Sequence, residues 1–235
     1  MYVYGKRIAK ELLKNNKEIY KVYLYEHFSD KEIIFSVQKA NIEVKYLSKK
    51  ELDNIEKGNH QGIILDVPEY HYYSFENLIN SAPSNPFYVI LDHLEDTHNL
   101  GAIIRTCEAA GVDGIIIPKD RSVSINSTVM KISSGALDNV KICMVTNLNR
   151  IIDKLKENGV WIIGTDLDDS VSYTEVDYNI PMALIIGSEG KGIGRLTKKL
   201  CDIVIKIPMK GKINSLNASV AAGIIIYKAI EKRGG

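Results

Sequence analysis

Short runs of apolar residues, each of strand length, recur between residues 87 and 208 and constrain the fold more than any other feature of the chain. The runs read FYVILD, GIIIP, VKICMV, VWIIGT, ALIIG and DIVIKIP, and segments of helix length separate them. Continuous β-branched runs are typical of strands that helices cover on both faces, as in a parallel sheet with crossover connections. The sequence therefore predicts an open, doubly wound sheet, in which ligands bind beyond the carboxyl ends of the strands.

The first seventy residues predict a smaller α/β unit. Helix patterns at 4–13 and 30–40, and a further short helix, alternate with the strand patterns YKVYLY, IEVKYL and GIILDV. Residues 68–86 then carry three prolines and a Ser/Asn-rich end, which is typical of a connector. We expect a first domain over residues 1–70, a linker over 71–84 and a second domain over 85–235.

Composition excludes several classes of protein. Hydrophobic residues make up 45% and charged residues 25% of the 235 residues, as in ordinary globular proteins. No apolar run reaches the roughly 18 residues that span a bilayer, so we expect no membrane partner and a cytoplasmic location. Cys107, Cys143 and Cys201 lie far apart in apolar contexts, which predicts reduced core thiols and no metal site.

Charge is distributed unevenly at the N-terminus. The net charge of the chain is +1, so any attraction for nucleic acid must be local. Residues 1–57 hold twelve Lys or Arg residues against nine Asp or Glu residues, and five of the basic residues lie between positions 6 and 17. A solvated helix surface explains this cluster, and an RNA-facing surface is the alternative.

The segment LDHLEDTHNLGAIIRTCEAAGV, residues 91 to 112, is the first candidate functional segment. Asn99 is a plausible N-cap, and apolar residues at positions 100, 103, 104 and 107 form the face expected to pack on the sheet. Arg105 and Glu108 lie on a different arc of the helix, where they form either a surface ion pair or part of a site. Gly101, in the first helical turn, indicates a close approach to the backbone.

The segment ALIIGSEGKGIG, residues 183 to 194, places four glycines after a buried strand. It matches neither GxGxxG nor GxxxxGK[ST], and Glu189 would repel a phosphate, which argues against a nucleotide triphosphate or a dinucleotide. The loop would suit a ligand that carries positive charge or needs hydrogen-bond acceptors. A glycine turn with a helix-capping Glu189 is the alternative.

The segment IPMKGKINSLNASVAAGI, residues 207 to 224, leads from a strand into a helix pattern. Asn214, Ser215 and Asn217 exceed what a single N-cap requires, although Asn214 or Ser215 remains a candidate cap. The helix pattern has an apolar face at positions 220, 224 and 227 and several small residues that would let another backbone or a flat ligand come close.

Together the three segments resemble the SpoU (TrmH-type) family of RNA ribose 2'-O-methyltransferases within the SPOUT class, most of all its 23S rRNA guanosine-2'-O-methyltransferase branch. The matching motifs are NLGAIIRTCEAAGV, LIIGSEGKGI and IPMKGKINSLNASVAAG, in the order that the family shows. The segments YGKRIAKELL and HQGIILDV also resemble the family's small N-terminal RNA-binding domain, which is similar to a ribosomal-protein α/β fold.

The resemblance implies an α/β fold of two domains, in which the C-terminal parallel sheet carries a deep trefoil knot. It implies S-adenosylmethionine as the methyl donor, held in the knot by Gly187, Ile207 and Leu216. It also implies a homodimer whose active site draws on both chains, which would fit the small-residue face of the last helix.

The resemblance further implies a catalytic site of Arg105, Asn99, Glu189, Ser215 and Asn217. Some accounts of the family make the arginine a general base, but arginine stays protonated in proteins. We therefore expect Arg105 to bind the phosphate beside the target ribose and orient the hydroxyl, while a phosphate oxygen or another group takes the proton. We expect Asn99 to position Arg105 or the RNA backbone, and Glu189 to fix the loop, the cofactor or the partner chain. Ser215 and Asn217 would donate hydrogen bonds near the hydroxyl.

The expected activity is therefore methylation of a ribose 2'-hydroxyl in RNA, on a guanosine of 23S rRNA. A tRNA 2'-O-methyltransferase is an alternative, although tRNA-directed relatives often lack the N-terminal domain. A relative that binds RNA without catalysis is another, and the presence of all the expected catalytic residues argues against it. A nicotinamide-dependent oxidoreductase is not expected, because its glycine fingerprint is absent.

Overall fold

The computed structural model describes residues 1–190, 192–212 and 215–234 of the chain. The chain forms two compact units, which are described separately. The first unit comprises Met1–His71 and Ile125–Gly135, and the second comprises Tyr72–Ser124 and Ala136–Gly235. The domain boundaries expected from the sequence stay a prediction; the segment 125–135, which the sequence placed in the second domain, has its contacts with the N-terminal residues.

The first unit is built on a four-stranded sheet in the order β1-β4-β2-β3. Its strands are β1 (Tyr2–Tyr4), β2 (Lys21–Tyr25), β3 (Val44–Leu47) and β4 (Ile63–Asp66). Strand β4 is antiparallel to both β1 and β2, and β2 is parallel to β3. Sequence patterns predicted β2, β3 and β4 but missed the three-residue β1, placing a helix start at Tyr4 instead. The chain cannot begin the helix there because Gly5 has a φ of 101° and donates its N–H to the carbonyl of Ile63.

Helices α1 (Lys6–Lys14), α2 (Lys31–Lys39) and α3 (Lys49–Ile55) complete the N-terminal part of this unit. Asp30 caps α2 and Ser48 forms a capping box with Glu51 at the start of α3, so local polar residues set both helix starts. Helices α1 and α2 pack on one core with residues such as Ile8, Leu12, Ile33 and Val37. Helix α6 (Ser127–Ser133) adds Met130 to the same core.

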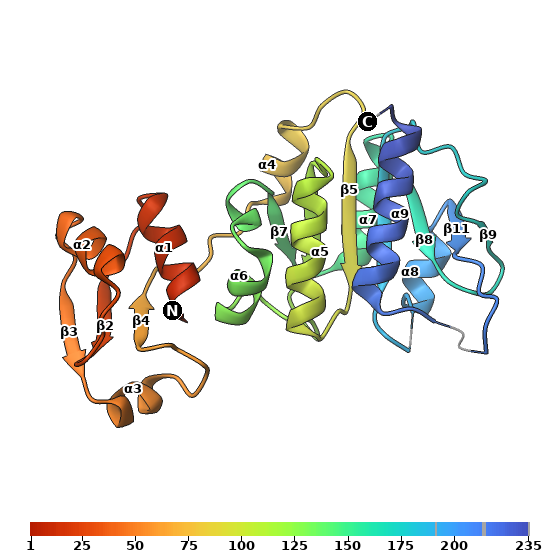
Figure 1. Cartoon of the computed structure of the whole chain (residues 1–235). Coiled ribbons are helices and arrows are strands. Elements are labelled where there is room, and N and C mark those ends of the chain that lie inside the picture. The colour runs from red at the N-terminus through yellow and green to blue at the C-terminus, as the bar shows by residue number, and fades with distance from the viewer. Residues whose placement is uncertain (191, 213–214, 235) are drawn as a thin grey trace. The chain divides into compact units, whose positions relative to one another are not determined.

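The second unit contains a seven-stranded sheet in the order β7-β6-β5-β10-β8-β11-β9, and every strand pair in it is parallel (Figure 1). The strands are β5 (Phe87–Asp92), β6 (Gly114–Pro118), β7 (Ile142–Val145), β8 (Trp161–Thr165), β9 (Val171–Ser172), β10 (Met182–Gly187) and β11 (Ile203–Lys206). Strands β5, β6 and β10 are buried at every residue, as continuous apolar runs predict. The two-residue β9 is the strand that the sequence patterns missed.

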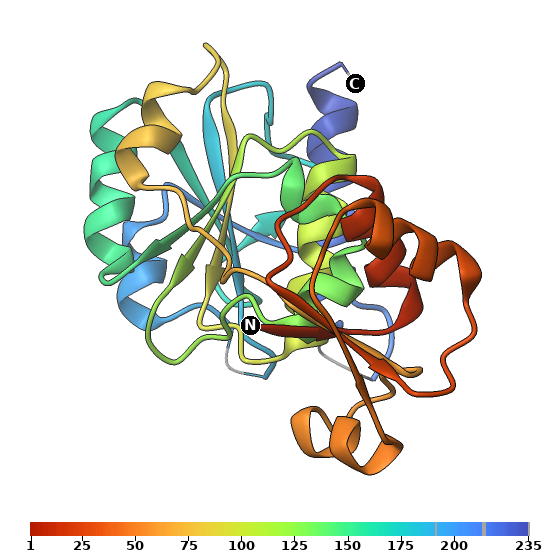
Figure 2. The same cartoon turned by 90° about the vertical axis from the view of Figure 1, so that its left-hand side faces the viewer.

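Helices cover both faces of this sheet (Figure 2). Helices α5 (Thr97–Ala109) and α9 (Ala218–Lys232) pack side by side on one face. The other face carries α4 (Phe75–Asn80), α7 (Leu148–Glu157) and α8 (Arg195–Leu200), whose apolar residues join one core with β5, β8 and β10. A 3-10 turn, η1 (Ala136–Asp138), completes the unit. The doubly wound parallel sheet is thus confirmed, while the trefoil knot stays a prediction.

No helix among residues 1–190, 192–212 and 215–234 combines the length and the apolar character needed to cross a membrane. Within the same residues, no group of three His, Cys, Asp or Glu side chains is arranged to hold a metal ion.

Candidate functional site

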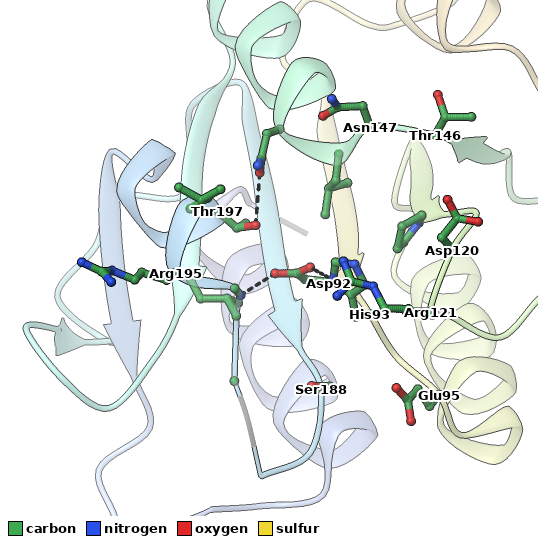
Figure 3. Close-up of a pocket in the computed structure, with 17 residues that line it drawn as sticks. Asp92, His93, Glu95, Asp120, Arg121, Thr146, Asn147, Ser188, Arg195 and Thr197 are labelled. Atoms are coloured by element: carbon green, nitrogen blue, oxygen red, sulfur yellow. Dashed lines mark hydrogen bonds and ion pairs between the residues drawn. The ribbon is translucent and has the colours of Figure 1, made fainter.

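The loop that follows β10 forms a wall of two cavities at the carboxyl ends of the parallel strands. One cavity of about 500 Å³ lies beyond β5, β6 and β7, with the side chains of Asp92, His93 and Arg121 in its lining (Figure 3). The other, of about 380 Å³, is lined by the loops that follow β8, β10 and β11 and by the start of α9. Ser188 and Gly192 line both cavities. The smaller cavity is the candidate cofactor site, because all three expected cofactor-binding residues line it.

Those three residues come from different segments of the chain. Gly187 ends β10, Ile207 follows β11, and Leu216 precedes α9. Apolar side chains make up much of the lining, and carboxylates supply its polar part, from Asp166, Asp168 and Glu189. Lys206 is the cation among the described lining residues. The cavity therefore combines an apolar surface with an excess of negative charge, which suits a flat, partly apolar ligand that carries positive charge.

The turn after β10 requires glycine at Gly187. A Cβ atom placed there would lie 2.1 Å from the carbonyl carbon of Gly192, which is closer than any real contact. The turn closes on itself through hydrogen bonds from the Ser188 N–H to the Gly192 carbonyl (3.1 Å) and from the Gly192 N–H back to the Ser188 carbonyl (2.9 Å). Gly190 and Gly192 have φ values of 75° and 66°, which other residues rarely adopt.

Asp92 holds the far end of this loop. Its side chain is 1% exposed, and its Oδ2 accepts a hydrogen bond of 2.7 Å from the N–H of Gly194 (Figure 3). Its Oδ1 contacts Nδ1 of His93. A buried carboxylate at the end of β5 thus anchors the loop of β10, and this role was not predicted from the sequence.

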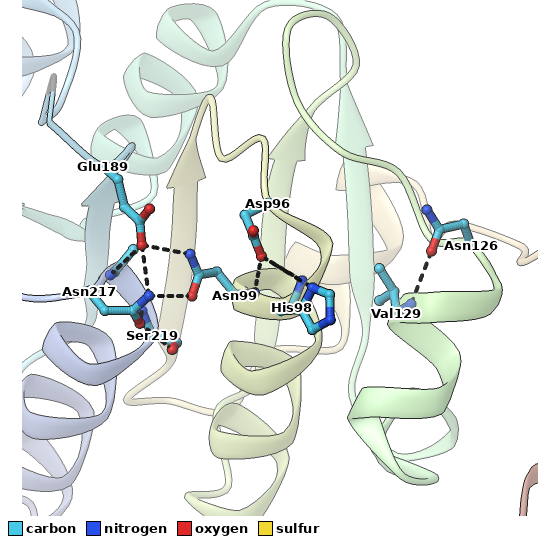
Figure 4. Close-up of polar contacts among 9 residues, drawn as sticks. Asp96, His98, Asn99, Asn126, Val129, Glu189, Asn217 and Ser219 are labelled. Atoms are coloured by element: carbon cyan, nitrogen blue, oxygen red, sulfur yellow. Dashed lines mark hydrogen bonds and ion pairs between the residues drawn. The ribbon is translucent and has the colours of Figure 1, made fainter. Parts of the chain in front are cut away.

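One carboxylate oxygen connects the three candidate segments (Figure 4). Oε1 of Glu189 accepts hydrogen bonds from Nδ2 of Asn99 (2.8 Å) and from Nδ2 of Asn217 (2.7 Å), and the backbone N–H of Ala218 lies 3.4 Å away. Asn217 also donates to Oδ1 of Asn99 at 2.9 Å. The structure therefore brings Asn99, Glu189 and Asn217 together as one polar cluster, which we call the Glu189 cluster.

Two of the expected helix caps are wrong. Asp96, not Asn99, caps α5: its Oδ1 accepts from the N–H groups of His98 (2.7 Å) and Asn99 (2.9 Å). Asn99 lies within the first turn and is 5% exposed, so its amide is free to reach Glu189. Helix α9 is capped by Asn217, whose Oδ1 accepts from the N–H groups of Ser219 and Val220.

Of the two residues expected to cap α9, Ser215 lines the candidate cofactor cavity and Asn214 lies outside the described residues. Asn217 uses both amide hydrogens within the Glu189 cluster and its amide oxygen in the cap. A hydrogen bond from Asn217 to a ribose hydroxyl would require one of these contacts to open, whereas the Ser215 hydroxyl has no such commitment among the described residues.

Arg105 lies on the exposed side of α5, more than one helical turn after Asn99, the residue that α5 contributes to the Glu189 cluster. The surface ion pair with Glu108 that was considered for it is absent among the described residues. Glu108 instead accepts a hydrogen bond of 3.0 Å from Nδ2 of Asn139. Arg105 therefore presents a positive charge without an ionic partner in the described part of the chain, and the expected contact with Asn99 is not formed.

Residues 165–168 belong to the candidate cofactor site but were missed in the sequence. Thr165, Asp166, Leu167 and Asp168 follow β8, the strand beside β10 in the sheet. Lys198 holds Asp166 through an ion pair of 3.1 Å. The signal was available, because a polar TDLDD loop after a buried strand lies where a parallel sheet binds ligands.

The apolar face predicted for the last helix is turned to solvent. Val220, Ile224 and Tyr227 of α9 are 49%, 36% and 53% exposed, while smaller and β-branched residues on its other side are buried against the sheet. Ile225 and Ile226 supply most of that buried side. The described part of the chain therefore leaves an apolar stripe on α9 uncovered.

The cysteines behave as core thiols. Cys107 and Cys143 are buried and Cys201 is half-buried, and none forms a disulfide. Burial raises the pKa of the Cys143 thiol to about 11 and that of the Cys201 thiol to about 12, and it raises the pKa of Cys107 further. The thiols are therefore protonated and unreactive at neutral pH.

Comparisons with known proteins agree with this geometry. Residues 86–227 match the model of the SpoU rRNA Methylase family, and residues 2–73 match the model of the RNA 2'-O ribose methyltransferase substrate binding domain. A putative TrmH family tRNA/rRNA methyltransferase YacO of Bacillus subtilis (strain 168) is 44% identical over 99% of this chain and 96% of its own length. A putative TrmH family tRNA/rRNA methyltransferase of Staphylococcus haemolyticus (strain JCSC1435) is 42% identical over 98% of this chain and 95% of its own length.

Solved structures share the fold over the whole chain. The SpoU methyltransferase AviRb from Streptomyces viridochromogenes, in complex with the cofactor AdoMet, has a TM-score of 0.81 at 21% identity and covers 100% of this chain and 91% of its own. The AdoMet-bound rRNA methyltransferase from Sinorhizobium meliloti has a TM-score of 0.77 at 25% identity and covers 98% of this chain and 86% of its own.

Proposed function

The chain belongs to the SpoU rRNA methylase family, and on that premise we propose that it transfers a methyl group from S-adenosylmethionine to the ribose 2'-hydroxyl of a guanosine in 23S rRNA. The observation that carries the proposal is that the Glu189 cluster joins the first motif, through Asn99, to the two motif loops that line the candidate cofactor cavity. Because the substrate is cellular RNA, we place the enzyme in the cytoplasm.

The residues of the smaller cavity fit S-adenosylmethionine. The cofactor has a flat, partly apolar base and carries positive charge on its sulfonium and amino groups. Ile207 and Leu216 offer apolar contacts, Gly187 lets the turn fold back against Gly192 at the cavity wall, and Asp166, Asp168 and Glu189 supply acceptors and negative charge. When bound, S-adenosylmethionine supplies an electrophilic methyl group on a positively charged sulfur.

The protein's own part in the reaction is to position the groups that react. A ribose hydroxyl is a weak nucleophile, so its orientation toward the methyl group and the removal of its proton both matter. Arg105 binds the phosphate next to the target ribose and orients the hydroxyl, and an oxygen of that phosphate accepts the proton. The arginine itself does not take the proton, because its guanidinium remains charged. Ser215 donates a hydrogen bond near the hydroxyl.

The Glu189 cluster acts on the shape of the site. The side-chain amides of Asn99 and Asn217 form hydrogen bonds with Glu189 and with each other, so we propose that they position the loops rather than contact the ribose directly. This revises the roles that the family resemblance implied for both asparagines. Glu189 holds the loop after β10 against the starts of α5 and α9.

A homodimer is part of the proposal. Helices α5 and α9 pack against each other, and α9 exposes the apolar stripe of Val220, Ile224 and Tyr227. A second copy of the chain would cover this stripe. The family resemblance implies an active site that draws on both chains, and the exposed Arg105 is accessible to the cofactor cavity of a second copy.

Ribosomal RNA is favoured over tRNA by the N-terminal unit. Residues 2–73 match a substrate-binding domain model, and the tRNA-directed branch often lacks such a domain. Curated relatives bear names that join tRNA and rRNA, so a tRNA target is the second candidate. A relative that binds RNA without catalysis is disfavoured, because Arg105, Ser215 and the Glu189 cluster are all present.

The decisive experiment maps 2'-O-methyl groups in cellular RNA with and without the gene. We expect one guanosine of 23S rRNA to lose its methyl group and to regain it on complementation with the native protein. Arg105→Ala should fail to restore the methyl group while binding S-adenosylmethionine with nearly native affinity in calorimetry. A chain that neither binds the cofactor nor changes any site would contradict the proposal, and a lost site in tRNA would redirect it.

A further inference from the structure

A groove in the N-terminal unit carries more positive than negative charge. It lies between α1 and α2, has a volume of about 760 Å³, and is lined by basic residues of both helices. Arg7, Lys10 and Lys14 of α1 and Lys39 of α2 face two acidic lining residues, Glu11 and Glu32. These residues include three of the basic cluster that the sequence left open as either solvated surface or RNA surface.

Three of the four cations have no ionic partner among the described residues. Lys10 is the exception, because it contacts Glu32 and lies 3.8 Å from Asp30, and the hydrogen bond to Glu32 raises its pKa. Arg7, Lys14 and Lys39 are exposed and form no ion pair in the described part of the chain. Uncompensated charges of one sign along a groove attract a ligand of the opposite sign.

The spacing of these charges suits a polyanion rather than one small anion. Arg7 and Lys14 are seven residues apart on α1, which corresponds to two helical turns and to about 10.5 Å along the helix axis. Seven residues also return to nearly the same helix face, so both side chains serve the groove. Cations at this spacing can each contact a different phosphate of one nucleic acid strand.

Helix α2, which supplies one side of the groove, also carries an exposed aromatic side chain. Phe35 of α2 is 65% exposed and belongs to neither core of the first unit. It precedes Lys39 by four residues, so the two side chains are neighbours on one helix face. The face of an exposed ring is a surface on which a nucleobase can stack, and such stacking tolerates any base.

We propose that the groove between α1 and α2 binds an unpaired segment of the RNA substrate. Arg7, Lys14 and Lys39 contact its phosphates, and Phe35 stacks on an unstacked base. A duplex offers the phosphates but keeps its bases stacked inside, so it lacks the contact with Phe35. The inference rests on the proposed function in taking RNA as the substrate, and it adds where and in which form the RNA is bound.

The test measures binding of the full-length protein to two fluorescent RNA probes between 50 and 200 mM salt: an unstructured oligonucleotide, and a perfectly paired hairpin whose strands are joined by a linker without bases. Arg7→Gln, Lys14→Gln and Lys39→Gln should each reduce the slope of log K against log salt by about 0.7 with the unstructured probe. Phe35→Leu should weaken binding of the unstructured probe about tenfold and leave the hairpin unchanged. Phe35→Tyr keeps an aromatic ring and should bind the unstructured probe as tightly as the native protein does. Lys45→Gln, which removes an exposed lysine of β3 outside the groove, should change neither probe.

Unchanged salt slopes in the three groove variants would overturn the proposal, as would a Phe35→Leu variant that loses the hairpin as strongly as the unstructured probe. Cofactor affinity, measured on every variant, shows that the second unit remains folded. The outcome is separable from that of the proposed function. Groove-dependent RNA binding without any methyl transfer leaves this inference standing and removes the function. Normal methylation with an unchanged KM for RNA, in a variant that carries the Arg7→Gln, Lys14→Gln and Lys39→Gln substitutions together, leaves the proposed function standing and removes this inference.

Discussion

Replacing Glu189 by alanine removes the acceptor that joins the three motif loops. Asn99 and Asn217 would each lose a hydrogen bond, of 2.8 and 2.7 Å, to the same carboxylate oxygen. Asn99 is 5% exposed, so water cannot easily replace the lost partner of its amide. The variant thus tests whether this one side chain holds the candidate cofactor site in shape.

The size of the effect follows from these contacts. A hydrogen bond to a charged group contributes about 1.5–3 kcal/mol, but Glu189 is exposed, and solvent screening lowers each bond toward about 1 kcal/mol. The two side-chain bonds together give about 2 kcal/mol, and the longer contact with Ala218 adds little. For a unit of this size we expect the midpoint of thermal unfolding to fall by about 4–8 °C. A loop tether worth about 1.4 kcal/mol corresponds to a tenfold change in cofactor affinity.

The assay combines urea unfolding with calorimetric titration of S-adenosylmethionine. Glu189→Gln keeps an oxygen acceptor and should lose about half as much stability as Glu189→Ala. Glu108→Ala is the control, because it removes a glutamate of α5 that accepts a hydrogen bond from one side-chain amide, that of Asn139, and lies outside the site. A double-mutant cycle of Asn99→Ala and Glu189→Ala should give a coupling energy of about 1 kcal/mol. Strictly additive single variants, or equal losses in the Glu189 and Glu108 variants, would refute the reasoning.

Three further predictions concern the core, the turn after β10 and pH. The Tyr88 hydroxyl is buried and has no hydrogen-bond partner among the residues that the structure describes, so Tyr88→Phe should keep or raise the melting temperature. Tyr178→Phe loses a 2.7 Å bond to a backbone carbonyl and should lower the free energy of unfolding by about 1 kcal/mol; the opposite order would contradict this assignment. Gly187→Ala should weaken cofactor binding more than tenfold in calorimetry, because the new Cβ would lie 2.1 Å from the backbone of Gly192. Gly223→Ala has open space at its Cβ and should leave the affinity unchanged. Equal affinities of the two variants would count against the close approach of Gly187 to Gly192. Burial raises the pKa of Cys143 to about 11, so this thiol should not affect the free energy of unfolding below about pH 8.5. Between about pH 9 and 11 the free energy of unfolding should fall, because the thiol loses its proton in the unfolded chain first. Urea titrations at pH 8 and pH 10 would measure this change, and a rise in stability at pH 10 would be inconsistent with the prediction.

Most of the sheet was predictable because its strands are buried on both faces. FYVILD and GIIIP matched β5 and β6 residue for residue, since a continuous apolar run ends where a polar loop begins. Strands β1 and β9 were missed because three and two residues are too few to show a period. Their own residues show no strand pattern, because β1 is a strand through its pairing with β4 and β9 through its pairing with β11.

The candidate site was predictable in its members but not in their roles. Asp96 and Asn99 are both good capping residues three positions apart, and local spacing could not show which one caps α5. The answer depends on Glu189, which lies 90 residues away and takes the amide of Asn99. Likewise, the sequence predicted the apolar face with Val220 and Tyr227 but not its exposure, because periodicity shows that a face is apolar and not whether the same chain covers it.

The Glu189 cluster also bears on when the enzyme becomes competent during its own synthesis. Its contacts join residues 90 and 118 positions apart, and Asn217 follows all seven strands of the parallel sheet along the chain. Contacts between residues so distant in sequence form late, because the intervening chain must first be made and ordered. The α9 residues Ala218, Ala221 and Ile225 also close the cofactor cavity. A nascent chain that still lacks α9 therefore has all the strands of its parallel sheet but an incomplete candidate cofactor cavity, so the newly made protein can bind a ligand there only after α9 has been added.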